Sequence, residues 1–412
     1  MNNNDELDNK IEEIDDSVIS ENEELADLDQ ETFTYTVDNN NVNNDYNKSV
    51  YNDKKSYVYI LIGVFTLIFI IVLLIVFVNK GKSKDTKYTD IESKMVSAAE
   101  KYYDKHSDML PVMDGSTITV TTDTLIEESF MKPFSEFVSD DVSCNGYVSV
   151  SNSGDEYVYF PYLKCDGEYE SLKLSQKIIS ENLVTSGDGL YNTSSGYVYR
   201  GEYPNNYVTF NDKSWRIMGI NSDGSLKLIY NDKKVQKNSW DDRYNSEKES
   251  YTGINDFRVS RLLEYLTKAY DDNEFVDAKN KKLLVKYDWC IGKVSDSDSL
   301  ISDLNLCSDV YSDTYIGVVS ISDILIPSVD PNCNSIFDIE CTNYNYFFNI
   351  NTGWTLNAIS DNSYVAFSSN GGSLYTKNAS AENSVRPVIN INGNILYKSG
   401  DGTLDHPYDI GY

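Results

Sequence analysis

The most strongly patterned part of the chain is one uninterrupted apolar run. Tyr57 to Val78 comprises 22 residues without a charged side chain. At about 1.5 Å per residue, a helix of this length crosses a ~30 Å hydrocarbon core. A soluble core helix would show a polar stripe, and a cleavable signal peptide has a shorter apolar region. The pattern predicts a single transmembrane helix over residues 57–79, with the lipid bilayer as its partner.

The segment before this run has no hydrophobic periodicity. Residues 1–45 hold 15 acidic residues and one basic residue, Lys10. Apolar residues are too sparse to bury a core, so residues 1–56 are predicted to form a disordered acidic tail. Docking of a cytoplasmic partner and simple solvation are both compatible with such a tail.

The orientation of the span is decided by the cysteines. Three lysines lie just before the span and five lie just after it, so charge alone would place the C-terminal part in the cytoplasm. All six cysteines, however, follow the span, and paired cysteines belong in an oxidising compartment. They are Cys144, Cys165, Cys290, Cys307, Cys333 and Cys341. Because long domains cross largely regardless of charge, we expect a single-pass cell-membrane protein with a cytoplasmic N-terminus and an extracytoplasmic C-terminal part.

Residues 80–184 are predicted to form a membrane-proximal module of a helix and a hairpin. Thr89 to Glu92 is a capping-box pattern, and an apolar face then predicts a helix to about His106, before Pro111. That face consists of Ile91, Met95, Ala99 and Tyr102. Thr117–Val120 is predicted to be a strand and Leu125–Met131 a short helix.

The hairpin can be predicted in register. Gly154 and Asp155 suit a two-residue type II′ loop, which pairs residues whose numbers sum to 309. Cys144 then lies opposite Cys165 as a non-hydrogen-bonded pair, a geometry compatible with a disulfide. Pro161 is tolerated in this register only on an edge strand. Two unpaired thiols in a longer loop are the alternative.

Residues 185–412 are predicted to form a distal, mainly antiparallel β domain. The polar stretch Ser171–Asp188, with a short helix possible at Leu172–Leu183, marks the boundary. Turn signals every eight to twelve residues then separate strand-like runs. These runs are Gly196–Arg200, Tyr207–Phe210, Ser214–Ile220, Leu226–Tyr230, Tyr315–Ser320, Trp354–Ser360, Tyr364–Phe367 and Ser384–Tyr397. A helix beginning near Asn255 carries an apolar face of Val259, Leu262, Leu263, Leu266 and Tyr270. The predicted fold class is α+β, with one or two helices in this domain.

Proximity predicts the two remaining disulfides. Six cysteines allow 15 connectivities, and grouping by domain leaves the last four to pair among themselves. We expect Cys290–Cys307 and Cys333–Cys341.

Composition excludes several functions. The chain has 35 Lys and Arg against 65 Asp and Glu, which argues against a nucleic-acid partner. Its two histidines, His106 and His406, nearly exclude His-dependent triads and multi-His zinc sites. Two clusters of aspartates could ligate Ca²⁺, but neither completes an EF-hand pattern. A solvated loop explains the first cluster better, and a turn explains the second. The clusters are Asp296, Asp298 and Asp303, and Asp401, Asp405 and Asp409. No cofactor is expected.

The tryptophans and the acids leave the function open. Trp215 and Trp354 lie in strand-like runs and are expected in the core, whereas Trp240 lies in a polar stretch, either exposed to a sugar or buried under a loop. A pair of carboxylates for glycoside hydrolysis cannot be read from sequence, because their separation in space is what defines it.

The order of the distal motifs resembles a family of uncharacterised extracytoplasmic domains in surface proteins of AT-rich Gram-positive bacteria. The matching stretches cover roughly the last 220 residues and include SWRIMGINSDGSLKLIYND, IGVVSISDIL, WTLNAIS, YVAFSSNGGSLY, SVRPVIN and KSGDGTLDHPYDI. The segments from WTL to VRPV are also similar to the C-terminal half of C-type-lectin-like and formylglycine-generating-type folds. The copper-binding cysteine pair of the latter has no counterpart here, which puts that activity in doubt. The module before the distal domain is similar in outline to a pilin-like helix followed by a sheet.

These features lead to an expectation about function. We expect a membrane-anchored surface protein that presents a non-catalytic ligand-binding domain, with an envelope glycan or a surface protein as ligand. The exported part from Lys80 on has a net charge of −18 by its Lys, Arg, Asp and Glu content, which favours a neutral glycan or a protein over an anionic polymer. The alternatives are a cell-wall-acting, carboxylate-dependent hydrolase and a purely structural or sensory envelope protein.

Overall fold

The computed structural model describes residues 87–411, except 155, 246–249, 252–255, 296, 298 and 361–364. The predicted acidic tail and the predicted transmembrane helix lie outside the described residues. Among the helices that are described, none is long and apolar enough to cross a membrane.

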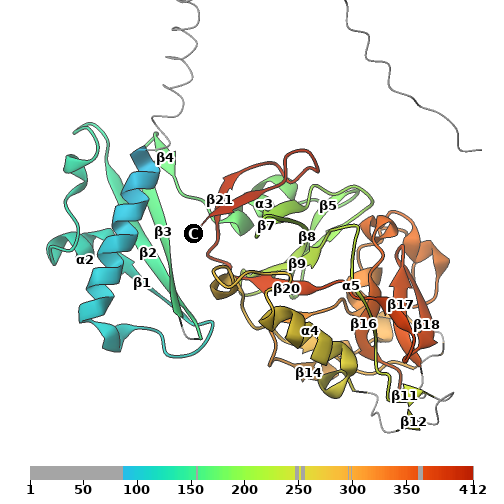
Figure 1. Cartoon of the computed structure of the whole chain (residues 1–412). Helices are drawn as coiled ribbons and strands as arrows, with labels where there is room; N and C mark the ends of the chain where they lie inside the picture. The colour runs from blue at the N-terminus through green and yellow to red at the C-terminus, as the bar shows by residue number, and fades with distance from the viewer. Residues whose placement is uncertain are drawn as a thin grey trace, which may run out of the picture. The chain divides into compact units, whose positions relative to one another are not determined.

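A helix of residues 87–105 covers one face of the first sheet (Figure 1). Its predicted apolar face is buried, with Ile91, Met95 and Ala99 at most 1% exposed. The antiparallel sheet has the order β1-β2-β3-β4, from β1 (Thr117–Thr121), β2 (Cys144–Ser153), β3 (Glu156–Cys165) and β4 (Tyr169–Glu170). The short helix α2 spans Thr122–Glu127 and so begins earlier than predicted, because the Thr121 hydroxyl caps it by accepting from the Thr124 N–H.

The predicted hairpin register is confirmed. Cys144 pairs with Cys165, Val148 with Pro161, and Ser153 with Glu156 across the loop. Gly154 has φ +71°, as the first loop position of a type II′ turn requires. The Cys144–Cys165 disulfide joins Cα atoms 4.1 Å apart. On its other side, β3 pairs with β4 only at its last two residues, so Pro161 lies on an edge.

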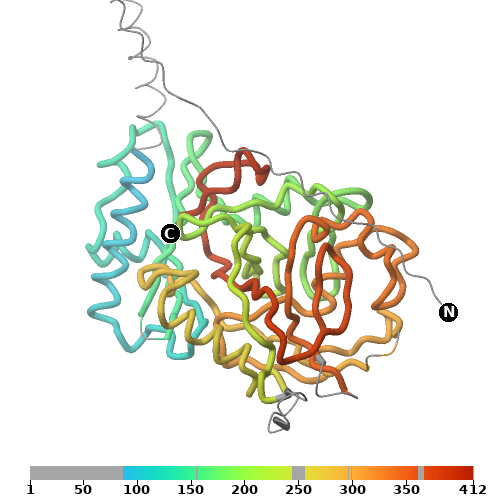
Figure 2. The backbone as a smooth tube through the Cα atoms, turned by 45° about the vertical axis from the view of Figure 1, so that its right-hand side comes forward, coloured from blue at the N-terminus to red at the C-terminus, as the bar shows by residue number. Residues whose placement is uncertain are grey.

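The distal domain is built around a seven-stranded antiparallel sheet. Its order is β15-β20-β9-β8-β6-β5, with β7 also paired to β8. The strands are β5 (Gly189–Thr193), β6 (Gly196–Arg200), β7 (Tyr207–Phe210), β8 (Lys213–Asn221), β9 (Leu226–Tyr230), β15 (Ile316–Gly317) and β20 (Val388–Ile391). The strand-like runs predicted between residues 196 and 230 are confirmed as β6 to β9, although β6 pairs with β8 and not with β7, and β5 is an added strand. Strand β20, from near the end of the chain, lies between β15 and β9, which come much earlier in the sequence. In Figure 2 the red end of the trace accordingly runs past segments drawn in green and orange.

Among the described residues, three α-helices pack with this domain, and the first of them precedes the predicted boundary at residue 185. They are α3 (Leu174–Asn182), α4 (Arg261–Asp271) and α5 (Ile321–Leu325). The predicted start of α4 near Asn255 is wrong, because Ser260 caps the helix with a side chain that accepts from the Leu263 N–H. Val259 consequently lies in a 3-10 turn and is 40% exposed.

Smaller elements complete the α+β fold. A three-stranded antiparallel sheet contains β16 (Gly353–Ala358), β17 (Val365–Asn370) and β18 (Ser373–Asn378). Four strand pairs are formed by β10 (Lys237–Ser239) with β19 (Glu382–Ser384), β11 (Tyr244–Asn245) with β12 (Ser250–Tyr251), β13 (Trp289–Cys290) with β14 (Val310–Tyr311), and β21 (Leu396–Ser399) with β22 (Asp409–Gly411).

Two hydrophobic cores hold the described chain together. One lies between the helix of residues 87–105 and the first sheet, and the other fills the distal domain. Strand β3 contributes to both, with Val158 and Phe160 in the distal core and Leu163 in the first. Trp215, Trp240 and Trp354 are all fully buried, so Trp240 is not available for stacking on a sugar. Its indole N–H donates to the Thr355 carbonyl at 3.1 Å.

Candidate functional site

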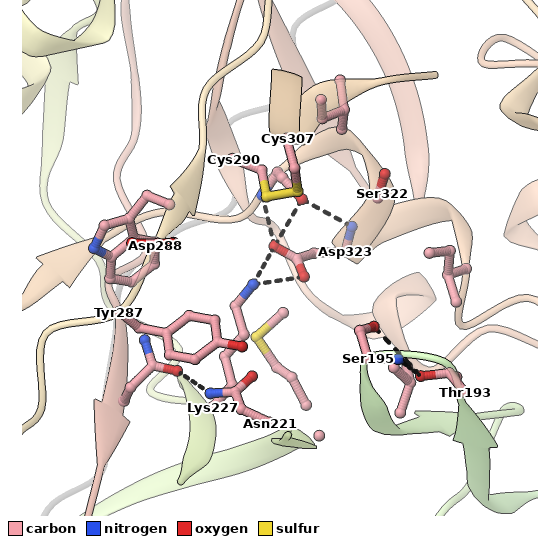
Figure 3. A pocket seen from close by; sticks show the side chains of 18 of the residues that line it. Thr193, Ser195, Asn221, Lys227, Tyr287, Asp288, Cys290, Cys307, Ser322 and Asp323 are labelled. Carbon is pink, nitrogen blue, oxygen red and sulfur yellow. Dashed lines mark hydrogen bonds and ion pairs between the residues drawn. A yellow bond between two sulfur atoms is a disulfide. The ribbon is translucent and has the colours of Figure 1, made fainter. Parts of the chain in front are cut away.

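A cavity of about 340 Å³ opens in the distal domain beside the seven-stranded sheet. Its lining comes from β6, the end of β8, β9, the segment 287–290 and α5. Figure 3 shows Tyr287 and Asp288 on one side of a central Lys227–Asp323 pair, and Thr193 and Ser195 on the other. The size falls near the lower end of small-molecule sites, which are about 300–1,000 Å³.

A row of three cross-strand neighbours forms the floor. Gly219 on β8 lies opposite Lys227 on β9, which in turn lies opposite Asn390 on β20. A Cβ at Gly219 would lie 2.3 Å from the Tyr197 carbonyl oxygen, so only glycine allows β6 and β8 to approach this closely.

The N-terminus of α5 positions the carboxylate. Ser320 and Asp323 form a capping box, in which the Ser320 hydroxyl accepts from the Asp323 N–H at 3.2 Å. The Asp323 Oδ2 atom in turn accepts from the Ser320 N–H at 2.8 Å and from its hydroxyl at 2.9 Å. The same residues that start the helix therefore fix the orientation of the carboxylate.

The carboxylate and the lysine form an ion pair. Lys227 Nζ donates to both Asp323 oxygens at 2.7 Å, and the two side chains are only 21% and 17% exposed. Two of the three N–H bonds of the ammonium are used in this contact, which leaves one donor. Nζ also lies 6.0 Å from the centroid of the Trp289 ring. The pair places a donor in the cavity without adding net charge.

A disulfide and buried hydrogen bonds hold the opposite wall. Cys290 is joined to Cys307, and the Asn357 side-chain amide donates to the carbonyls of Cys290 and Gly292 at 3.2 and 3.0 Å. The Trp289 indole N–H donates to the Thr314 carbonyl at 3.1 Å. These contacts make the wall rigid, as a preformed binding site requires.

Two carboxamides line the cavity next to the lysine. Asn221 Nδ2 donates to Asn390 Oδ1 and to the Ser225 hydroxyl, each at 2.9 Å. Asn390 Nδ2 is buried and has no hydrogen-bond partner among the described residues. Leaving a buried donor unsatisfied costs about 1–3 kcal/mol, so such a group in a cavity wall indicates a place for an acceptor.

A buried tyrosine, Tyr346, also lines the cavity. The Tyr346 hydroxyl also has no partner within the described part of the chain. Burial raises the pKa of Tyr346, and the nearby Arg216 guanidinium opposes this effect. Its ring lies 4.6 Å from that guanidinium.

The other sites considered from sequence do not join this cavity. Asp303, Asp401, Asp405 and His406 are exposed, and Asp296 and Asp298 lie outside the described residues. Hydrogen bonds from Thr403 lower the pKa of Asp401, which explains that residue as part of a turn. Over the residues that the structure describes, no group of three or more His, Cys, Asp or Glu side chains could hold a metal ion.

The three predicted disulfides are all present, and the second lines the cavity. Cys290–Cys307 and Cys333–Cys341 join Cα atoms 4.3 and 4.6 Å apart. Sequence reasoning missed Lys227, Asp323 and Asn390 as a site. The Ser320-x-x-Asp323 pattern was a signal for the helix cap, but no local signal links it to Lys227.

Comparisons with protein-family models, curated proteins and solved structures find no match to this chain. The resemblance inferred from the distal motifs therefore stays a prediction.

Proposed function

We propose that this chain is a membrane-anchored cell-surface protein whose distal domain binds a neutral glycan without catalysing a reaction. The observation that carries the proposal is the Lys227–Asp323 ion pair on the floor of the 340 Å³ cavity. The predicted transmembrane helix and the three disulfides support a location at the outer face of the cell membrane.

The chemistry of the ion pair favours a neutral polyol. An anionic ligand would meet the Asp323 carboxylate, and a cationic ligand would meet the Lys227 ammonium. A sugar hydroxyl both donates and accepts hydrogen bonds, so it suits a floor with one remaining lysine donor beside carboxylate oxygens. The half-buried rings of Tyr197 and Tyr287 add apolar wall against which the C–H face of a sugar can pack.

The hydrolase alternative is less well supported by this geometry. The cavity is lined by two carboxylates, Asp323 and Asp288, among the described residues. Asp323 accepts hydrogen bonds from Lys227 and Ser320, and Asp288 accepts one from the Ser312 hydroxyl. Asp323 is thus committed to holding α5 and the ion pair, whereas a general acid has to hold a proton and deliver it to the leaving group.

The proposal is tested by glycan binding to the full-length chain in lipid nanodiscs. We expect a neutral oligosaccharide on a glycan array to bind, and we expect Lys227→Met to weaken that binding by about ten-fold, or about 1.4 kcal/mol. Lys237→Met makes the same change on an exposed strand residue and should have no effect. Binding of proteins but of no neutral glycan would contradict the proposal. So would hydrolysis of a wall polymer that Asp323→Asn abolishes.

A further inference from the structure

A loop beside β18 holds three large apolar side chains in solvent. Ile339, Tyr344 and Phe348 are 65%, 57% and 58% exposed, and all three lie in one ten-residue segment. The segment contains two 3-10 turns, Ile339–Thr342 and Tyr346–Asn349. Because a 3-10 turn rises about 2.0 Å per residue, the Cα atoms of Tyr344 and Phe348 lie within about 10 Å of each other. Exposed apolar side chains that gather in this way mark interaction surfaces.

The backbone of this loop is fixed although its apolar side chains are exposed. Tyr344 has φ +47°, a left-handed conformation that a bulky residue rarely adopts. Its carbonyl accepts from the Val329 N–H at 3.4 Å, and the Asn343 carbonyl accepts from the Ser328 hydroxyl at 2.8 Å. A disulfide closes the segment just before it. Because the conformation is already held in place, little conformational freedom would be lost on binding.

The loop is bordered by carboxylates that lack a basic partner. Among the described residues, the ion pairs do not involve Asp330, Asp338 or Glu340. Hydrogen bonds from backbone N–H groups lower the pKa of Asp330 and of Asp338, so both stay ionised at neutral pH. The Arg200 guanidinium comes near the loop but donates to the Ser328 carbonyl, at 2.5 Å. The border of the loop is therefore negatively charged.

This charge indicates which partner suits the loop. Residues 294–376 contain ten acidic residues and no Lys, Arg or His. A second copy of the chain would bring the same acidic surface against the first in a symmetric contact, and like charges would repel. A polypeptide that carries Lys or Arg beside apolar side chains can instead cover the apolar groups and pair with the carboxylates.

We propose that residues 338–349 form a docking surface for a basic polypeptide segment. Tyr344 and Phe348 are its apolar anchors, and Asp330, Asp338 and Glu340 pair with Lys or Arg of the partner. Tyrosine is among the residues that most often carry the binding energy of an interface. Neither anchor lines the 340 Å³ cavity, so this inference goes beyond the proposed function and does not depend on glycan binding.

The test uses three short synthetic peptides and the full-length chain in phosphatidylcholine nanodiscs. The first peptide has lysines around one leucine and one phenylalanine. The second has glutamates in place of the lysines, and the third has serines in place of the two apolar residues. By calorimetry, with empty nanodiscs as the blank, we expect the first to bind at least about ten-fold more tightly than either of the others.

Variants locate the binding on the loop. Tyr344→Asn combined with Phe348→Ser should weaken binding of the first peptide by about ten-fold or more. Asparagine is chosen because it tolerates the left-handed conformation. Val112→Ser combined with Met113→Ser removes two exposed apolar side chains from the membrane-proximal module and should leave the affinity unchanged. If the loop variant does not fold, Phe348→Ser alone gives the same comparison.

Three results would overturn the inference. The first is equal affinity of the peptide for the loop variant and the control variant. The second is equal affinity for the lysine peptides with and without apolar residues, because charge alone would then explain the binding. The third is dimerisation of the chain in sedimentation that the loop variant abolishes, because a second copy would then cover this surface. Each of these results leaves glycan binding at the cavity untouched.

Discussion

At the scale of single residues, the cavity depends on a glycine, a lysine and an asparagine that face one another across three strands. Gly219 permits the close approach of β6 and β8, and Lys227 and Asn390 supply the polar groups. The burial of Trp215 and Trp354 could be predicted, because each lies in an apolar strand-like run. The alignment of Gly219, Lys227 and Asn390 across the three strands could not be predicted, because these residues become neighbours only when β20 pairs with β9.

The raised pKa values of one buried and one half-buried tyrosine lead us to predict a specific loss of stability at alkaline pH. Burial raises the pKa of Tyr103 and of Tyr159 from 10.0 to about 12, with smaller contributions from their acidic and tyrosine neighbours. Their ring centroids are 6.4 Å apart between the first helix and the first sheet. Because the folded pKa is the higher one, their contribution to stability is complete below the unfolded value and is lost as the pH rises through the folded value. We expect the free energy of unfolding to fall between about pH 10 and 12.

This prediction is checked by denaturant unfolding at several alkaline pH values. The double variant Tyr103→Phe, Tyr159→Phe should show a smaller decrease, because neither ring can then ionise. Tyr344→Phe changes an exposed ring and should keep the decrease seen in the wild-type chain. A double variant that loses stability as steeply as the wild type would show that these rings do not cause the effect.

At the scale of elements, local rules predicted some boundaries and failed at others. The hairpin register followed from two loop residues, because pairing around a two-residue loop fixes every partner. The start of α4 did not follow from its apolar pattern. Val259 fits the helical period but precedes the cap, and the cap depends on a side-chain hydrogen bond from the Leu263 N–H to Ser260.

The cap of α4 yields a prediction for stability. Ser260→Ala removes the side-chain acceptor for the Leu263 N–H and should lower the free energy of unfolding by about 1 kcal/mol. Ser186→Ala makes the same change at an exposed residue and should alter stability by less than about 0.5 kcal/mol. Thermal or urea unfolding of the two variants measures the difference, and equal midpoints would mean that Ser260 does not cap the helix.

At the scale of the whole molecule, the sequence predicted the α+β class, the mainly antiparallel sheets and the three disulfides. Each disulfide closes a short segment, with separations of 21, 17 and 8 residues, and this is why proximity in sequence was a sufficient guide. The cavity, unlike the disulfides, could not be predicted from proximity in sequence. Its lining comes from segments between Thr193 and Asn390, so no local pattern could indicate it.

The central claim is that the cavity around Lys227 and Asp323 is where a glycan binds. Hydrogen–deuterium exchange of the full-length chain, with and without a bound neutral oligosaccharide, tests this claim most directly. We predict slower exchange in the cavity segments 193–198, 219–228, 287–290 and 320–327. The exposed apolar residues Ile339, Tyr344 and Phe348 provide an internal comparison. Protection confined to residues 339–348, with the cavity segments unchanged, would contradict the account.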